Sequence, residues 1–163
     1  MANNRIWLSV VSCAVVAVAA TATATEWRPS DDFLMAVREV ESSNGKFKVG
    51  DSGQSLGDFQ LSEAAWLDVN SWRRSRGLKT YHYEQAVFNG FINKVYASNY
   101  LTILHGELSR ALRRAPSHGE LYAAYNMGLA EFAECNYRLT RVNAMTRAKV
   151  RQINEFLAAR TDS

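Results

Sequence analysis

Apolar residues recur at helical spacing along most of this chain, and only two prolines interrupt the pattern. The first apolar stripe holds Phe33, Val37 and Val40. It follows the Ser-Asp-Asp triplet at 30–32, in which any of the three side chains can cap a helix. The helices predicted in this way cover about residues 31–43, 62–76, 84–114, 120–127 and from 143 onward. No convincing run alternates apolar and polar residues as half-buried strands do, so we expect a mainly α fold.

The helical pattern stops between residues 44 and 57. Four glycines fall in this stretch, among asparagine, aspartate and serine residues that favour turns. The stretch therefore predicts a small turn-rich or β-hairpin segment inside an otherwise helical domain.

The N-terminal residues have the features of a secretory leader. Arg5 precedes an uncharged apolar stretch over 6–20, and small residues then offer cleavage after Ala22 or Ala24. We expect a signal peptide over residues 1–24 and export to the periplasm or the extracellular space.

Two alternatives to cleavage stay open. The apolar run is nearly long enough to span a bilayer, so the leader can also be read as an uncleaved membrane anchor. Cys13 can be read as a lipid-attachment site. Cleavage would leave one domain over 25–163 with Cys135 as its single cysteine, so we expect no internal disulfide. We expect this domain to be a monomer.

The charge balance narrows the class of partner. Without Arg5 the chain keeps 18 of its 19 basic side chains against 16 acidic ones, a net charge of +2. We interpret the basic clusters at 73–79 and 110–114 as solvated helix ends. The alternative is attraction to an anionic polymer, for which peptidoglycan suits an exported protein better than nucleic acid does.

The histidines give no sign of a metal centre. His82, His105 and His118 lack metal-ligand spacing with Cys135 or with a pair of carboxylates. We expect no metal and no cofactor.

Three short motifs suggest a site that cleaves glycans. Glu41-Ser42-Ser43 ends the first predicted helix, Gly57-Asp58-Phe59-Gln60 follows the glycine-rich stretch, and Ala124-Tyr125-Asn126 lies in the fourth helix. In such a site one carboxyl group protonates a glycosidic oxygen while polar groups hold the sugar. In order and character the motifs resemble the lytic transglycosylase and goose-type lysozyme family, over most of the chain after the leader. The resemblance implies a lysozyme-like α domain over 25–163 that acts on the glycan strands of peptidoglycan.

The resemblance also implies a role for each matching residue. Glu41 would be the catalytic acid, and Ser42, Gln60 and Asn126 would contact the substrate. The hydroxyl group of Tyr125 would support the acid from within the same site.

Helical periodicity gives an independent reason to single out Glu41. It follows Val37 by four residues, so it lies at the inner edge of the apolar stripe. We expect partial burial there, which favours the protonated form that a general acid needs. For Tyr125 the alternative role is core packing, because Tyr122 and Tyr125 are three residues apart on one helix face.

Asp51 decides between two reactions. The segment Gly50-Asp51-Ser52-Gly53 resembles one in goose-type lysozymes, and an inverting hydrolase needs a second carboxylate about 6.5–9.5 Å from its acid. Aspartate before Ser-Gly is also ordinary turn chemistry. Goose-type enzymes often carry an acid just after the glutamine motif, where this chain has Ser62. We therefore expect a lytic transglycosylase that cleaves the MurNAc-GlcNAc β-1,4 bond with Glu41 alone and forms a 1,6-anhydro product.

Other functions remain open at this point. One is a muramidase, a hydrolase that uses Glu41 and Asp51. Another is a catalytically weak glycan-binding domain, because Asp58, Phe59 and Met127 depart from the family motifs. A helical interaction domain with coincidental motif matches is the third.

Overall fold

The computed structural model describes residues 26–161, so the leader expected over 1–24 lies outside the described residues. Helices and three short strands make up this part of the chain, which confirms a mainly α fold with a small hairpin. None of the helices within it has both the length and the apolar character needed to cross a bilayer. In chain order the elements are α1 (Asp31–Ser42), β1 (Val49–Gly50), the 3-10 turn η1 (Asp51–Gly53), β2 (Ser55–Leu56), β3 (Leu61–Ser62), α2 (Glu63–Arg74), α3 (Tyr83–Ala86), α4 (Gly90–Leu112), α5 (His118–Met127), α6 (Leu129–Glu134) and α7 (Ala144–Thr161).

Serine side chains determine where the first two helices begin. The Oγ of Ser30 accepts a hydrogen bond from the backbone N–H of Phe33 at 3.2 Å, and the Oγ of Ser62 accepts one from Ala65, also at 3.2 Å. These contacts satisfy N–H groups that the first turn of a helix leaves without a backbone partner. Ser30 is thus the cap among the three candidates at α1, and the cap predicted for α2 is confirmed.

The single long helix predicted over 84–114 is wrong at its start. The chain forms the short α3, leaves the helical conformation, and begins again as α4. Asn89 has an extended backbone, with φ −77° and ψ 109°, and its Oδ1 accepts the N–H of Ile92 at 3.1 Å. An asparagine cap followed by Gly90 therefore favours a new helix start over a continuous helix. The short α6 also lies outside the helices that the periodicity predicts.

The glycine-rich stretch forms the β1–β2 hairpin of a three-stranded antiparallel sheet, in which the strand order is β1-β2-β3. Val49 lies opposite Leu56, and Leu56 lies opposite Leu61. Gly57, between β2 and β3, has φ +82°, and a Cβ there would lie 2.4 Å from the carbonyl oxygen of Val87. Only glycine fits this close approach between the sheet and the segment before α4.

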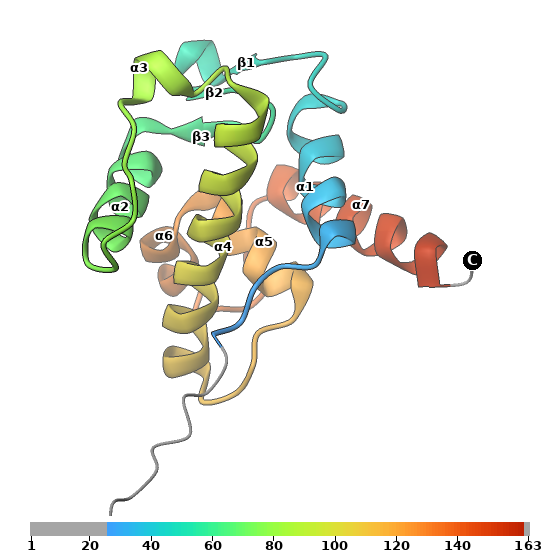
Figure 1. Cartoon of the computed structure of the whole chain (residues 1–163). Helices are drawn as coiled ribbons and strands as arrows, with labels where there is room; N and C mark the ends of the chain where they lie inside the picture. The colour runs from blue at the N-terminus through green and yellow to red at the C-terminus, as the bar shows by residue number, and fades with distance from the viewer. Residues whose placement is uncertain (1–25, 162–163) are drawn as a thin grey trace, which may run out of the picture.

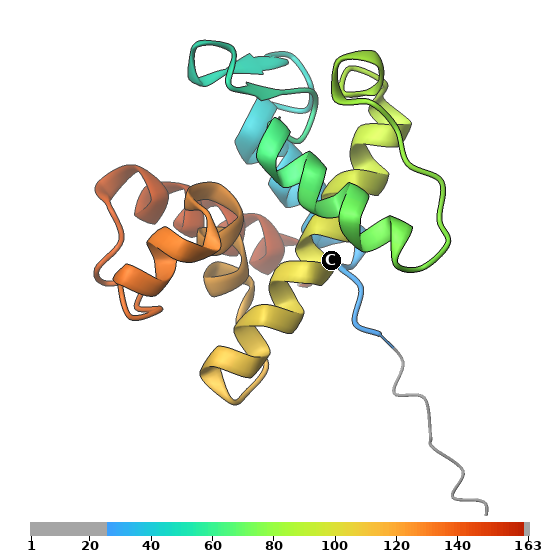
Figure 2. The same ribbon diagram turned by 90° about the vertical axis from the view of Figure 1, so that its left-hand side faces the viewer.

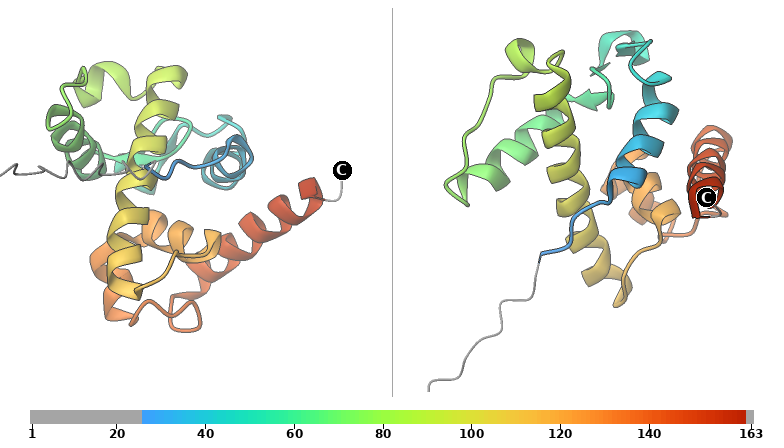
Figure 3. Two further views of the ribbon diagram at one scale, coloured as in Figure 1. Left: turned by 60° about the horizontal axis from the view of Figure 1, so that its bottom comes forward. Right: turned by 45° about the vertical axis from the view of Figure 1, so that its right-hand side comes forward.

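The long α4 is the central element of the fold. It runs from the small sheet to the α5 end of the molecule, as Figures 1 and 2 show, and both α2 and α5 pack against it. The C-terminal α7 packs on α5 and on α1, and the right-hand view of Figure 3 shows it beside α1. The helix that carries Glu41 is therefore held by the last helix of the chain.

Aromatic side chains fill the core between α2 and α4. The rings of Trp66 and Tyr96 stack with centroids 3.8 Å apart, and both side chains are fully buried. The Tyr96 hydroxyl donates to Asn70 Oδ1 at 2.5 Å and accepts the N–H of Tyr81 at 2.8 Å. Because the buried hydroxyl is satisfied in both roles, it packs in the core without leaving an unpaired polar group.

Candidate active site

Glu41 lies in the last turn of α1, and both of its carboxyl oxygens have partners from other helices. Oε1 accepts a hydrogen bond from the Tyr122 hydroxyl at 2.5 Å, and the Asn126 amide lies 3.5 Å from the same oxygen. Oε2 lies 3.0 Å from the ammonium nitrogen of Lys149. The Glu41 side chain is 6% exposed. The carboxyl group is therefore buried as expected and held in one orientation.

The helical repeat of α5 explains two of these contacts. Tyr122 and Asn126 are four residues apart, so they lie on the same face of α5 and reach the same carboxyl group. Burial, followed by the charge of Glu41, raises the pKa of the Tyr122 hydroxyl. Tyr122 therefore keeps its proton and acts as the donor in this pair.

Two residues of α7 complete the cluster. Thr146 Oγ1 donates to Asn126 Oδ1 at 2.9 Å, which leaves the amide nitrogen of Asn126 turned toward Glu41. Thr146 and Lys149 are three residues apart and share a face of α7. The cluster of Glu41, Tyr122, Asn126, Thr146 and Lys149, here called the Glu41 cluster, thus joins α1, α5 and α7.

Lys149 compensates for the unfavourable position of Glu41 at a helix end. A carboxylate in the last turn faces the negative end of the helix dipole, and α1 has no basic residue in that turn. The Lys149 ammonium supplies the missing positive charge from α7. The ion pair between Lys149 and Glu41 thus links the end of α1 to α7.

A pocket of about 280 Å³ lies beside this cluster. Asn126 belongs to both, because it lines the pocket and contacts Glu41. Gln60 and Tyr125, two more residues predicted for the site, also line it, together with Ser62 and Asp68. Glu41 itself does not line the pocket, and its contact with Asn126 at 3.5 Å is the link between the two.

A larger hollow of about 760 Å³ adjoins the pocket. The two share Asp68, Tyr100, Met127 and Gly128 as lining residues, and the larger one continues past Trp72. Together they form an open trough between α2, α4 and the α5–α6 junction. A trough of this kind suits an extended polymer better than a small enclosed ligand.

The prediction that the Tyr125 hydroxyl supports the acid is wrong. Tyr125 donates instead to the backbone carbonyl of Phe59 at 2.7 Å, and its side chain is nearly buried. Tyr122, one turn earlier on α5, makes the contact with Glu41. Tyr125 thus has the alternative role weighed above, core packing, and it also lines the pocket.

The predicted contact between Ser42 and a sugar is also wrong. Ser42 is 2% exposed, and its hydroxyl group lies 2.6 Å from the carbonyl oxygen of Asp58 and 3.1 Å from that of Arg38. It also accepts the N–H of Gly45 at 2.8 Å. Ser42 therefore ties the end of α1 to the loop before β3 and is out of reach of a ligand.

Gln60 lies at the pocket but also supports the sheet. Its Nε2 donates to the carbonyl oxygens of Gly57 at 2.8 Å and Phe47 at 3.2 Å. Asp51 opens the turn η1 between β1 and β2. Its side chain lies outside the described part of the chain, so its separation from Glu41 stays untested.

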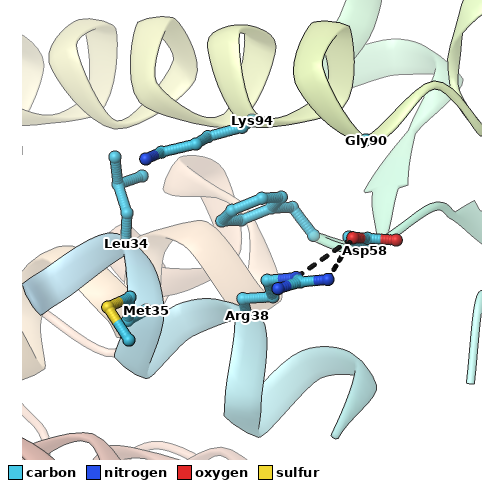
Figure 4. A pocket seen from close by; sticks show the side chains of 7 residues that line it. Leu34, Met35, Arg38, Asp58, Gly90 and Lys94 are labelled. Carbon is cyan, nitrogen blue, oxygen red and sulfur yellow. Dashed lines mark hydrogen bonds and ion pairs between the residues drawn. The ribbon is translucent and has the colours of Figure 1, made fainter. Parts of the chain in front are cut away.

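A separate pocket, of about 270 Å³, lies between α1 and the start of α4. It shares no lining residue with the 280 Å³ pocket beside the Glu41 cluster. Figure 4 shows the Arg38 guanidinium turned toward the Asp58 carboxylate, 2.7 Å away. Burial acts to raise the pKa of Asp58, but Lys48 and Arg38 outweigh it and leave the pKa below its usual value. Asp58, one of the departures from the family motif, thus has a structural role in this ion pair.

Three members of the Glu41 cluster were not predicted as site residues. The sequence contains a feature that could have identified Tyr122, because this residue precedes Asn126 by four positions on the same predicted helix. Nothing in the sequence indicates Thr146 or Lys149, whose helix joins the site only through the tertiary fold. Within residues 26–161, no three or more histidine, cysteine, aspartate or glutamate side chains are grouped so that they could hold a metal ion.

Comparisons of the chain with models of known protein families, with curated proteins and with solved structures found no match.

Proposed function

We propose that this chain cleaves the glycan strands of peptidoglycan as a lytic transglycosylase, with Glu41 as its catalytic residue. The observation that carries the proposal is the placement of Asn126, which contacts the buried carboxyl group of Glu41 and also lines the pocket beside it. One carboxyl group, fixed in position and in contact with a residue that lines an open pocket, suits a single-acid glycan-cleaving site. The resemblance of the three motifs supports the same reaction class.

The proposed reaction has two proton transfers through Glu41. The protonated carboxyl group gives its proton to the glycosidic oxygen as the bond between that oxygen and the anomeric carbon breaks. The resulting carboxylate then takes the proton of the sugar's own 6-hydroxyl group, whose oxygen attacks the anomeric carbon. This closes a 1,6-anhydro ring, restores the acid and consumes no water.

The leader expected over residues 1–24 supports a substrate outside the cytoplasm, where peptidoglycan lies. The proposal accordingly includes export to the periplasm or the extracellular space. Peptidoglycan strands are the proposed partner.

A glycan-binding domain without strong catalysis is the second candidate. One observation favours it: the Glu41 carboxyl group is 6% exposed and paired with Lys149, which is also the arrangement of a purely structural ion pair. Both candidates predict binding to glycan strands, so the test has to measure bond cleavage.

The test compares Glu41→Gln with wild type on purified peptidoglycan. Glutamine matches the size of the carboxyl group but cannot act as an acid, so turnover should fall by about 100- to 10,000-fold. Mass spectrometry of the wild-type digest should find 1,6-anhydro ends. Reducing ends would instead favour the muramidase alternative with Glu41 and Asp51.

Glu39→Gln is the matched control, because Glu39 lies on α1 two residues earlier and bonds to Asn44 instead of the cluster. It should keep near-wild-type turnover. If Glu41→Gln folded and cleaved as fast as wild type, Glu41 would not be the acid and the proposal would fail. If wild type bound the strands without cleaving them, the glycan-binding domain would be the better description.

A further inference from the structure

Lys149 is the cation paired with Glu41 among the described residues, and it comes from a helix that no motif includes. Its Nζ lies 3.0 Å from Glu41 Oε2, and the two side chains are 26% and 6% exposed. A pair this sheltered from water is screened far less than an ion pair on the surface. The contact is therefore strong enough to affect the chemistry of the carboxyl group.

The two carboxyl oxygens of Glu41 have different partners. Oε1 is held by the Tyr122 hydroxyl and approached by Asn126, whereas Oε2 is held by Lys149. Other charged side chains nearby on α1 have partners elsewhere, because Arg38 pairs with Asp58 and Glu39 bonds to Asn44. The charge on Lys149 thus acts on Glu41 directly.

The other titratable groups that face Glu41 come from α5. They are Tyr122, which donates to it, and Tyr125, whose pKa is raised by burial and then by the charge of Glu41. Both tyrosines stay neutral at ordinary pH, so neither adds a charge to the site. Lys149 therefore remains the charged side chain in contact with the Glu41 carboxyl group.

We propose that Lys149 is a positioning residue that fixes Oε2 of Glu41 and stabilises the carboxylate formed between the two proton transfers. This inference rests on the proposed function. When Glu41 gives its proton to the glycosidic oxygen, negative charge develops 3.0 Å from the ammonium group, and the opposite charges attract. Lys149 therefore stabilises the negative charge on Glu41 at the moment of bond cleavage.

The same attraction should also change the pH dependence of cleavage, which can be measured. Because a nearby cation favours the charged form of a carboxyl group, the inference predicts that the pH–rate profile depends on the charge at position 149. The alkaline limb of the pH–rate profile should then lie lower with Lys149 than without it.

The experiment compares Lys149→Met and Lys149→Arg with wild type in cleavage of purified peptidoglycan across pH. Lys149→Met should lower the maximal rate about tenfold and move the alkaline limb upward by about one pH unit or more, the effect of removing an adjacent opposite charge. Lys149→Arg keeps the charge, so it should restore the wild-type position of the limb and most of the rate.

Arg160→Met is the matched control for a purely structural role. Arg160 also lies on α7 and pairs with a residue of α1, Asp32, at 2.8 Å, but it is outside the Glu41 cluster. The pH–rate profile of Arg160→Met should keep the wild-type shape. Circular dichroism at each pH checks that every variant is folded where its rate is measured.

The possible outcomes separate this inference from the proposed function. If wild type cleaves and folded Lys149→Met keeps the wild-type limb, Lys149 is only structural and the inference is overturned while the function stands. If Lys149→Met fails to fold, Lys149→Arg provides the test. That variant keeps the positive charge, so an alkaline limb displaced from its wild-type position would also overturn the inference. If wild type cleaves nothing at any pH, the proposed function fails, and the inference fails with it.

Discussion

Two tyrosines on α5 show how one helical turn separates a positioning role from a packing role. Tyr122 and Tyr125 are three residues apart with ring centroids separated by 6.4 Å, yet their hydroxyl groups point to different acceptors. The motif match identifies Tyr125, because it compares sequence order alone. Helix geometry instead pairs Tyr122 with Asn126, because residues four apart lie on one face.

At this scale we predict different turnover for the two phenylalanine variants. Tyr122→Phe removes the hydrogen bond to the Glu41 carboxyl group and keeps the ring, so both stability and turnover should fall. Hydrogen bonds to charged groups contribute about 1.5–3 kcal/mol, so turnover should fall roughly 10- to 100-fold. Peptidoglycan turnover and urea unfolding measured on the same samples check both parts.

Tyr125→Phe is the contrasting variant. It leaves the buried carbonyl oxygen of Phe59 without its donor, which should cost about 1–3 kcal/mol of unfolding free energy. Turnover of the folded protein should stay within a few-fold of wild type. A larger loss of turnover in Tyr125→Phe than in Tyr122→Phe would return the supporting role to Tyr125.

At the scale of single elements, the start of α5 has a capping box whose glutamate also forms an ion pair. Ser117 Oγ accepts the N–H of Glu120 at 3.2 Å, and Glu120 accepts the N–H of Ser117 at 2.8 Å. Arg114 adds two contacts to the same carboxylate, which is 11% exposed. The hydrogen bond from Arg114, and then those from Ser117, outweigh burial and lower the pKa of Glu120 to about 2.

This cap predicts a pH-dependent stability. A carboxyl group whose pKa falls on folding stabilises the protein above its unfolded pKa, about 4.3 for glutamate, and loses that contribution as pH falls through its folded pKa. Glu120→Gln should therefore lower the unfolding free energy by about 1.5–3 kcal/mol at pH 7. The difference from wild type should shrink between about pH 4.3 and pH 2. Urea unfolding at pH 7, 5 and 3 measures it.

Glu107→Gln is the control for this prediction. Glu107 pairs with Arg110 one turn later on α4, and its side chain is 40% exposed, so the pair should contribute less than about 1 kcal/mol. A Glu120→Gln deficit that stayed constant down to pH 3 would mean that the carboxylate charge does not stabilise the cap.

Local sequence signals predict most elements because caps and turns act over three or four residues. Ser30 and Ser62 act within their own segments, and the helices they begin follow the prediction. The break before α4 escapes the prediction because apolar spacing continues through it, while the deciding contact is the side chain of Asn89. Periodicity reports which face is buried and does not report whether the helix is continuous.

At the scale of the whole molecule, the candidate site draws on residues far apart in the chain. Glu41 and Lys149 are 108 positions apart, and Glu41 and Tyr122 are 81 apart. No periodic pattern gives the pairing of α7 with α1, because many helix faces are compatible with one apolar stripe. The motifs therefore predict Glu41 on α1 and Asn126 on α5 but miss Tyr122 and the contribution of α7.

A site assembled from separate helices should form and disappear with the fold as a whole. Leu108 lies on α4, is fully buried and lines neither part of the trough. Leu108→Ala should lower the unfolding free energy by about 2–5 kcal/mol through lost burial and the cavity left behind. Because small domains usually unfold in one step, glycan cleavage and far-UV circular dichroism should be lost together, at a lower urea concentration than in wild type.

Leu67→Ala is the matched control, because Leu67 is 55% exposed on α2 and its loss should change stability by less than about 0.5 kcal/mol. If cleavage activity in Leu108→Ala disappeared at clearly lower urea than the helical signal, the helices around Glu41 would separate from α4 before the rest unfolds. Site and fold would then be distinct cooperative units. Coincident transitions would mean instead that the core around α4 also maintains the contacts of Glu41 with Tyr122 and Lys149.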